Sequence, residues 1–233
     1  MRPLRFTRHL VGALLTLAAC ASHAADGVSA SQILIGQTLT LQGGKNEYGA
    51  AVRAGVEAAV EQVNRSGGVA GRRLVFKVLD DDNQPERAEA NARQLVGQDK
   101  VLLLFGSIEG GPSTAVMKAA LELKVPFFGP MAGSPTLRVP HQPLVFPVRA
   151  EHKDEFRALM AHARSLGMSK VAFVRSDSET GRQHLANVQR LAKETGIDAV
   201  TDLPFKSDIG DAQLADMASR IAASGAEVVF NHG

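Results

Sequence analysis

Apolar runs and helical stripes alternate along almost the whole chain. The stretches 33–41, 73–79 and 101–106 are largely apolar and have the length of strands. Continuous rather than alternating apolarity favours strands that are buried on both faces. Between the first two stretches, valines recur every three or four residues, which predicts the buried stripe of a helix. These valines are Val52, Val56, Val60 and Val63.

The alternation continues to the C-terminus and predicts an α/β fold with parallel sheets and helices on both faces. A passage at 146–151 divides the elements into two Rossmann-like lobes, an N-terminal lobe over 25–148 and a second lobe over 149–233. The last predicted strand has no helix after it, so we expect the second lobe to be incomplete. The other elements are helices at 85–96, 113–124, 151–166, 182–195 and 209–224 and extended segments at 125–130, 144–148, 170–175, 198–204 and 227–231.

Residues 1–24 have the pattern of a secretory signal peptide. Three arginines and no acid precede the apolar segment 10–19, which is too short to span a bilayer. Ser22 and Ala24 then supply the small residues of a cleavage site, so we predict export to the periplasm. The sequence LAAC, which ends at Cys20, also resembles a lipoprotein cleavage box, and a lipid anchor on Cys20 is the alternative.

The charge balance gives no sign of a nucleic-acid or membrane-surface partner. The chain has 26 basic and 24 acidic residues, and the predicted leader removes three arginines and no acid, which leaves a net charge of −1. A nearly neutral net charge implies neither a nucleic-acid nor a membrane-surface partner, and we predict no nucleic-acid partner. Without Cys20 the exported protein has no cysteine, so its core alone must stabilise it.

The loop after the third strand could in principle bind phosphate or carry a nucleophile. Its sequence at 106–113, GSIEGGPS, matches neither G-x-G-x-x-G nor G-x-x-x-x-G-K-[ST], so no nucleotide cofactor is predicted. Ser107 and Ser113 lack the G-x-S-x-G context of an activated serine. We therefore predict no catalytic residue, and a secreted α/β hydrolase that uses Ser107 or Ser113 is a weaker alternative.

The acidic run DDDN at 80–83 is a candidate metal site by composition alone. Gln84 and Pro85 follow it, so the spacing of an EF-hand calcium loop is absent. Acidic residues just before a helix also interact favourably with the helix dipole. We therefore interpret this run as the start of a helix, and no metal is predicted.

Two loops of small residues favour binding over catalysis. Glycines at the start of a helix leave backbone N–H groups uncovered, and these donors suit a carboxylate. Ser113 could bind the ligand or cap the helix. The loop at 130–136 offers a second exposed backbone and a serine hydroxyl. The predicted ligand contacts are Gly110, Gly111 and Ser113 in the first loop and Ala132, Gly133 and Ser134 in the second.

In this order of elements the chain resembles the periplasmic substrate-binding proteins of branched-chain amino acid ABC transporters, the leucine/isoleucine/valine type. The similarity covers nearly all of 32–233. Several segments carry the resemblance, namely EYGAAVRAGVEAAVEQVNRSGGVAGRRLVFKVLDDDNQPERAEANARQLV (47–96), LFGSIEGGPSTAV (104–116), VPFFGPMAGSPTLRVP (125–140) and FPVRAEHKDE (146–155).

The resemblance implies a periplasmic binding protein of type I that captures an amino acid or amide-like solute between its lobes and delivers it to an ABC permease. It implies that the two small-residue loops clasp the solute carboxylate and that Tyr48 lies at the mouth of the pocket. Gly111 stands where the family often has threonine, Glu109 looks inserted, and Thr180 replaces an aromatic residue. The family also extends well beyond residue 233.

A ligand-sensing module of the same fold, which reports to a receptor rather than to a transporter, is a further alternative. The sequence does not separate sensing from transport.

Overall fold

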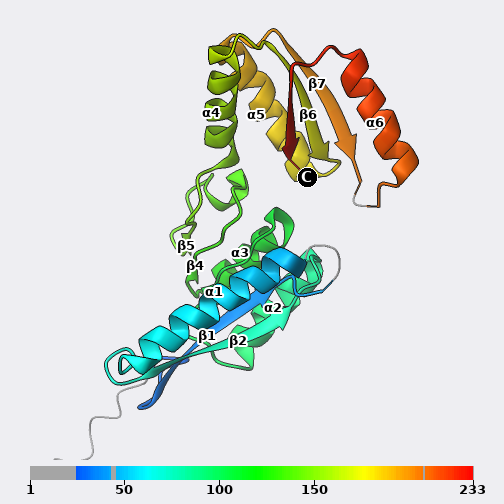
Figure 1. The fold of residues 1–233 in the computed structure, drawn as a ribbon. Coiled ribbons are helices and arrows are strands. Elements are labelled where there is room, and N and C mark those ends of the chain that lie inside the picture. The colour runs from blue at the N-terminus through cyan, green and yellow to red at the C-terminus, as the bar shows by residue number, and fades with distance from the viewer. Residues whose placement is uncertain (1–24, 43–45, 207, 233) are drawn as a thin grey trace, which may run out of the picture.

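The computed structural model describes residues 25–42, 46–206 and 208–232, so the predicted leader and Cys20 lie outside the described residues. Two separate parallel sheets form two lobes (Figure 1), which confirms the predicted fold class. Within the described ranges, no helix combines the length and the apolar character needed to cross a membrane.

The first sheet has five strands in the order β2-β1-β3-β4-β5, and every neighbouring pair is parallel. Its long pair, β1 and β2, runs in register from Gln32 opposite Arg73 to Leu39 opposite Asp80. The elements of this lobe are β1 (Gln32–Leu39), α1 (Asn46–Arg65), β2 (Arg73–Asp80), α2 (Pro85–Gly97), β3 (Leu104–Phe105), α3 (Gly110–Leu123), β4 (Phe127–Phe128), the 3₁₀ turn η2 (Pro135–Leu137) and β5 (Val145–Phe146).

Helices cover the two faces of the first sheet unequally. Helix α1 lies over one face, and α2 and α3 lie over the other (Figure 1). The core forms on the α2 and α3 side, where small helical residues let these helices approach the strands closely. Burial of this side stabilises the first lobe. Its buried members include Ala88, Ala92, Leu95, Leu104, Val116, Ala120 and Phe127.

The second sheet has three parallel strands in the order β7-β6-β8. Helices α4 and α5 pack on one face around Phe156, Phe173 and Leu191, and α6 packs on the other through Met217. The elements are α4 (His152–Ser165), β6 (Lys170–Ser176), α5 (Glu179–Thr195), β7 (Ala199–Phe205), α6 (Asp211–Ala223) and β8 (Val228–His232).

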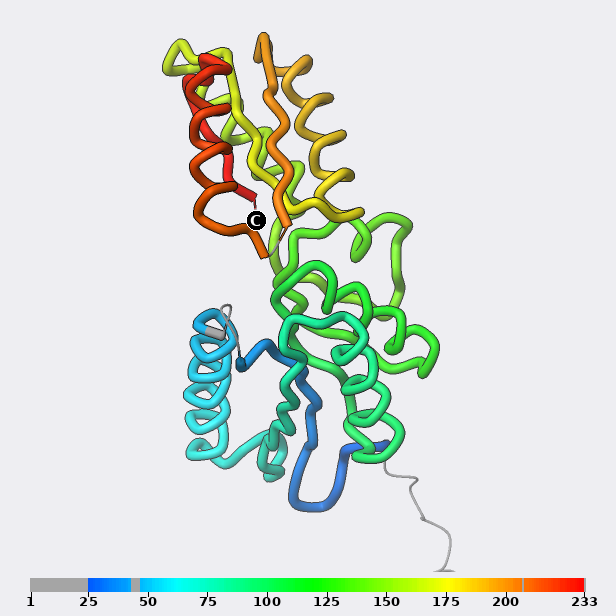
Figure 2. The backbone as a smooth tube through the Cα atoms, turned by 90° about the vertical axis from the view of Figure 1, so that its right-hand side faces the viewer, coloured from blue at the N-terminus to red at the C-terminus, as the bar shows by residue number. Residues whose placement is uncertain are grey.

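The strand order of each sheet indicates where a ligand would bind. In the first sheet the order reverses between β1 and β3, and in the second it reverses between β6 and β8. In open parallel sheets, ligands bind outside the carboxyl ends of the strands at such a reversal. The end of β8 lies at the junction of the lobes, above the first lobe (Figure 2). The loops beyond these strand ends therefore face one another.

Three details of the predicted elements were wrong. Helix α3 begins at Gly110, three residues before the predicted start, so Gly110 and Gly111 belong to its first turn. Helix α5 begins at Glu179, also three residues before its predicted start. The third, fourth and fifth strands each have only two residues in the ladder. These strands are short because neighbours such as Gly106 leave the extended conformation at positive φ.

The acidic run after β2 has a structural use. Asp81 is 1% exposed, and its carboxylate accepts hydrogen bonds from the hydroxyls of Thr38 and Thr40 at 3.0 and 2.8 Å. It also accepts from the backbone N–H of Asn83. The carboxylate therefore joins the ends of β1 and β2 and shapes the turn into α2.

Replacing Asp81 by alanine is expected to lower the free energy of unfolding by about 2–3 kcal/mol, because two buried hydroxyls lose a charged acceptor. Urea denaturation measures this change. Glu57→Ala is the matched control, since Glu57 is exposed on α1 and forms an ion pair with Arg53 one helical turn away. An Asp81 variant as stable as the Glu57 variant would show that the hydrogen bonds contribute nothing.

Candidate functional site: a cleft between the lobes

A cavity of about 720 Å³ lies where the carboxyl ends of the two sheets meet. Its volume is in the usual range for sites that bind small molecules. The first lobe contributes the starts of α1 and α3 and the loop before η2. The second lobe contributes the starts of α4 and α5 and the end of β8. Residues that line it include Tyr48, Asn83, Glu109, Gly110, Gly111, Ala132, Ser134, Arg149, His152, Ser176, Thr180, His184, Asn231 and His232.

The start of α3 forms the centre of the first wall. The first N–H groups of a helix have no partner within the helix, and the helix dipole makes this end partly positive. Gly110 and Gly111 carry no side chain that would cover these groups, and both line the cavity. A Cβ on Gly110 would lie 3.8 Å from the Thr180 methyl and 3.9 Å from the Ser134 Cβ. The lobes therefore approach each other closely at Gly110.

The structure places Ser113 away from the cavity, which corrects both of its expected roles. Ser113 is fully buried in α3, and its hydroxyl donates to the Ser107 hydroxyl at 3.0 Å. Glu109, not Ser113, is the N-cap residue of α3. Because Ser107 is also buried, neither serine is presented as a nucleophile. The hydrolase alternative therefore gains no support.

The loop at 130–136 lies beside α3, as expected, but only part of it reaches the cavity. The hydroxyls of Thr114 and Thr136 are 2.8 Å apart, and Ser134 bonds Thr136 at 2.9 Å. Ala132 and Ser134 line the cavity. The backbone at Gly133 does not, because the His152 ring covers it and the His152 N–H donates to the Gly133 carbonyl at 2.9 Å.

Tyr48 lies on the first turn of α1 and lines the cavity with 69% of its surface exposed. Tyr48 therefore lines the same cavity as Gly110 and Gly111. The place at the pocket mouth that the resemblance implies stays a prediction.

The cavity wall carries both charge signs, and the sequence analysis missed the positive one, Arg149. The Arg149 guanidinium lines the cavity and makes two bonds to the Glu155 carboxylate, at 2.8 and 3.0 Å. Glu109 lines the same cavity. A wall with both charge signs and a bare helix start suits a zwitterion better than a simple anion. Arg149 was missed because it lies in the segment interpreted as a passage between the sheets.

Three histidines, which the sequence analysis did not connect, meet on the second-lobe wall. His152 begins α4, His184 lies on α5, and His232 ends β8. The Nδ1 atom of His152 lies 3.2 Å from Nε2 of His184 and 2.9 Å from Nε2 of His232. Separations of 32 and 80 residues along the chain leave no local motif, so no spacing rule would have found the group.

These imidazoles are held neutral. Burial, and then repulsion from His232 and from nearby arginines, lowers the pKa of His152 to about 3. Burial also lowers the pKa of His184 to about 3, with smaller contributions from the other two rings. Burial likewise lowers the pKa of His232. All three rings therefore keep a free nitrogen lone pair at neutral pH.

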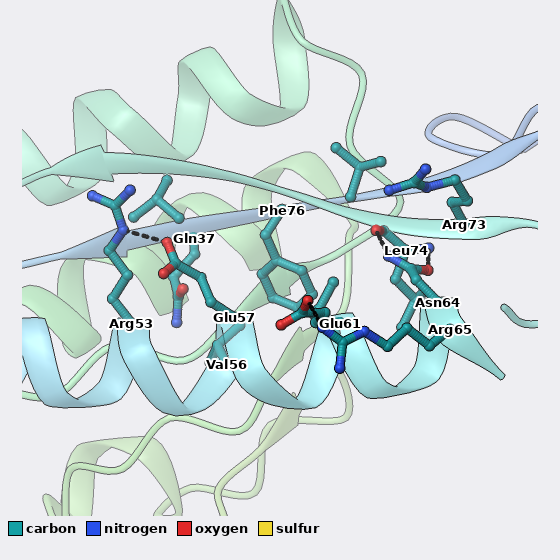
Figure 3. Close-up of a pocket in the computed structure, with 13 residues that line it drawn as sticks. Gln37, Arg53, Val56, Glu57, Glu61, Asn64, Arg65, Arg73, Leu74 and Phe76 are labelled. Atoms are coloured by element: carbon teal, nitrogen blue, oxygen red, sulfur yellow. Dashed lines mark hydrogen bonds and ion pairs between the residues drawn. The ribbon is translucent and has the colours of Figure 1, made fainter.

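A second hollow of about 660 Å³ lies between α1 and β2 (Figure 3). Its floor is apolar, with Val56 and Phe76, and ion pairs of α1 surround it, such as Arg53 with Glu57 at 2.7 Å. This hollow lies along the side of the sheet and not at the carboxyl ends of the strands. The cleft between the lobes is therefore the better candidate for a solute site.

Two α/β lobes whose parallel strands end at a shared, solute-sized cavity define a two-lobed binding protein. Residues 32–232 match the family described as periplasmic binding protein, and the chain belongs to this family. It is 27% identical over 205 residues to the Leu/Ile/Val-binding protein homolog 3 of Brucella melitensis, covering 87% of this chain and 55% of that relative.

Solved structures agree with the family assignment. An extracellular ligand-binding receptor from Verminephrobacter eiseniae matches with a TM-score of 0.72 and 31% identity, covering 86% of this chain and 57% of that one. A solute-binding protein from R. palustris in complex with benzoate has the same fold, with a TM-score of 0.76 at 23% identity, over 87% of this chain and 56% of that one. The chain therefore spans a little over half the length of these relatives.

Proposed function

We propose that this chain is a periplasmic solute-binding protein that captures a small amino acid or amide-like molecule for an ABC importer. The observation that carries the proposal is the cavity at the carboxyl ends of both sheets, with the bare start of α3 in its wall. The family includes Leu/Ile/Val-binding proteins, which supports an amino acid, and the benzoate-bound neighbour supports a carboxylate group on the solute.

The solute carboxylate would accept hydrogen bonds from the N–H groups of Gly110 and Gly111 and face the positive end of the α3 dipole. Arg149 would add a positive charge on the same side of the solute, and Glu109 would attract an ammonium group. No bond to the solute is made or broken in this scheme. Affinity would come from these contacts and from closure of the lobes.

A solute panel tests the proposal. The protein, without an affinity tag and with EDTA present, is titrated by calorimetry with L-leucine, L-valine, benzoate and acetamide. We expect one-to-one binding of an amino acid and weaker binding of benzoate, which lacks the ammonium. A folded protein that binds none of the four would contradict the proposal. Tighter binding of acetamide than of the amino acids would place the solute in the amide class.

A further inference from the structure

The three histidines on the second-lobe wall bring three ring nitrogens to one point. We propose that His152, His184 and His232 bind a divalent first-row transition-metal ion, with zinc as the ion for the test. Imidazole nitrogen is a preferred ligand of zinc, copper and nickel. The ligand atoms come from α4, α5 and β8, and all lie within 4.8 Å of one another.

The spacing of the nitrogens fits a tetrahedral ion. Zinc–nitrogen bonds of about 2.0–2.1 Å imply nitrogen–nitrogen distances of about 3.3–3.4 Å at a tetrahedral centre. The distances from Nδ1 of His152 are 3.2 Å to His184 and 2.9 Å to His232. Binding an ion therefore requires His152 to move a few tenths of an ångström away from the other two rings, and it requires the ligand atoms of His184 and His232, which lie within 4.8 Å of each other, to take up a similar spacing.

Hydrogen bonding among the rings does not account for the group as well as an ion does. A neutral imidazole has one N–H and one acceptor nitrogen. Nδ1 of His152 lies within hydrogen-bond distance of two Nε2 atoms. If Nδ1 carries the hydrogen, it can donate to only one of them, and if it does not, it can only accept. One cation at the shared point would satisfy all three facing lone pairs.

The surroundings hold the rings in place. The Phe156 ring lies beneath all three, with ring centres 6.2 Å from His152, 5.7 Å from His184 and 5.3 Å from His232. Gly133 allows the close approach of His152 from the other side. Arg149, the cation on the same wall, is paired with Glu155, which reduces its repulsion of an ion. Side chains packed in this way keep ligand atoms near a productive geometry.

Three protein ligands leave a fourth position for another group. All three histidines line the cavity, so a group in the cavity could supply the fourth ligand. Water or a carboxylate can fill it. Coordination of the solute's carboxylate to the ion rests on the proposed function, whereas ion binding itself depends only on the histidines.

Zinc titration without any organic solute tests the site. The untagged protein is dialysed against EDTA, freed of the chelator and titrated by calorimetry, and cobalt(II) is added in parallel to read four-coordination from its visible spectrum. We expect one zinc per chain. His152→Asn and His232→Asn should each weaken zinc binding at least about tenfold, because loss of a second-shell partner alone costs about 10–100-fold.

His162→Asn is the matched control, because His162 is exposed on the same helix as His152. Circular dichroism checks that each variant is folded, and His232→Asn, at the end of the last strand, keeps the test informative if the His152 variant unfolds. Equal zinc affinity in the wild type and the His232 variant, or no micromolar binding to the folded wild type, would overturn the metal site. Solute binding in EDTA is measured separately, so either proposal can fail alone.

Discussion

Replacing Gly110 by leucine is expected to reduce solute affinity at least about 100-fold, which corresponds to about 2.7 kcal/mol. A Cβ at this position already reaches contact distance with Thr180 of the second lobe and Ser134 of the first. The three further carbons of leucine would occupy the space in which the lobes meet and would cover the N–H groups at the start of α3. Calorimetric titration with the solute that the panel identifies measures the loss.

Two control variants test whether the loss of solute affinity comes from the leucine side chain at position 110. Gly110→Ala should bind almost as the wild type does, because its Cβ makes only ordinary contacts at 3.8 and 3.9 Å. Gly55→Leu introduces the same side chain on α1, at a position with nothing within 4 Å of an added Cβ, and should leave affinity unchanged. Undiminished binding by folded Gly110→Leu protein would show that the solute does not lie at α3.

Replacing Gly133 by alanine is expected to disturb both the fold and the histidine group. An added Cβ would lie 2.1 Å from Cδ2 and 2.4 Å from Nε2 of His152, so the ring must move. Overpacking of this kind costs about 1–3 kcal/mol of unfolding free energy. The displaced Nδ1 would leave the shared point, so zinc affinity should fall at least about tenfold. Urea denaturation and zinc titration measure the two effects.

Gly97→Ala is the control for this substitution. Gly97 ends α2, and no atom of the residues that the structure describes lies within 4 Å of an added Cβ there. Alanine is the better helix former, so this variant should be as stable as the wild type or slightly more so. If Gly133→Ala matched it in stability and in zinc affinity, the close packing of His152 on Gly133 would have no energetic consequence.

The order of the elements could be predicted from the sequence because buried parallel strands and amphipathic helices have distinct periods. The stripe of Val52, Val56, Val60 and Val63 lies on α1, and all the predicted strands occur. The start of α3 was misplaced because glycine and proline are poor helix formers in the interior of a helix. Proline is nevertheless tolerated in a first turn, where its missing N–H costs no hydrogen bond.

The lining of the candidate cavity was predicted in part. The sequence indicated which loops lie at strand ends, and Gly110, Gly111, Ala132, Ser134 and Tyr48 line the cavity. Burial is a tertiary property, so the sequence did not reveal that Ser113 points into the core or that His152 covers Gly133.

Local patterns could not have predicted that Arg149 and Glu109 line one cavity, because only the meeting of the two lobes brings them there. Nor could they have predicted the histidine group, whose members come from three different elements.

The most direct test of the account follows the amides at the start of α3 by NMR. The chain has 22 glycines, so selective ¹⁵N-glycine labelling gives a simple spectrum, and the variants Gly110→Ala, Gly111→Ala, Gly55→Leu and Gly97→Ala assign the four signals that the test uses. On saturation with L-leucine, the Gly110 and Gly111 signals should shift strongly while those of Gly55 and Gly97 stay fixed. Binding of the solute without any shift at Gly110 and Gly111 would contradict carboxylate capture at this helix start.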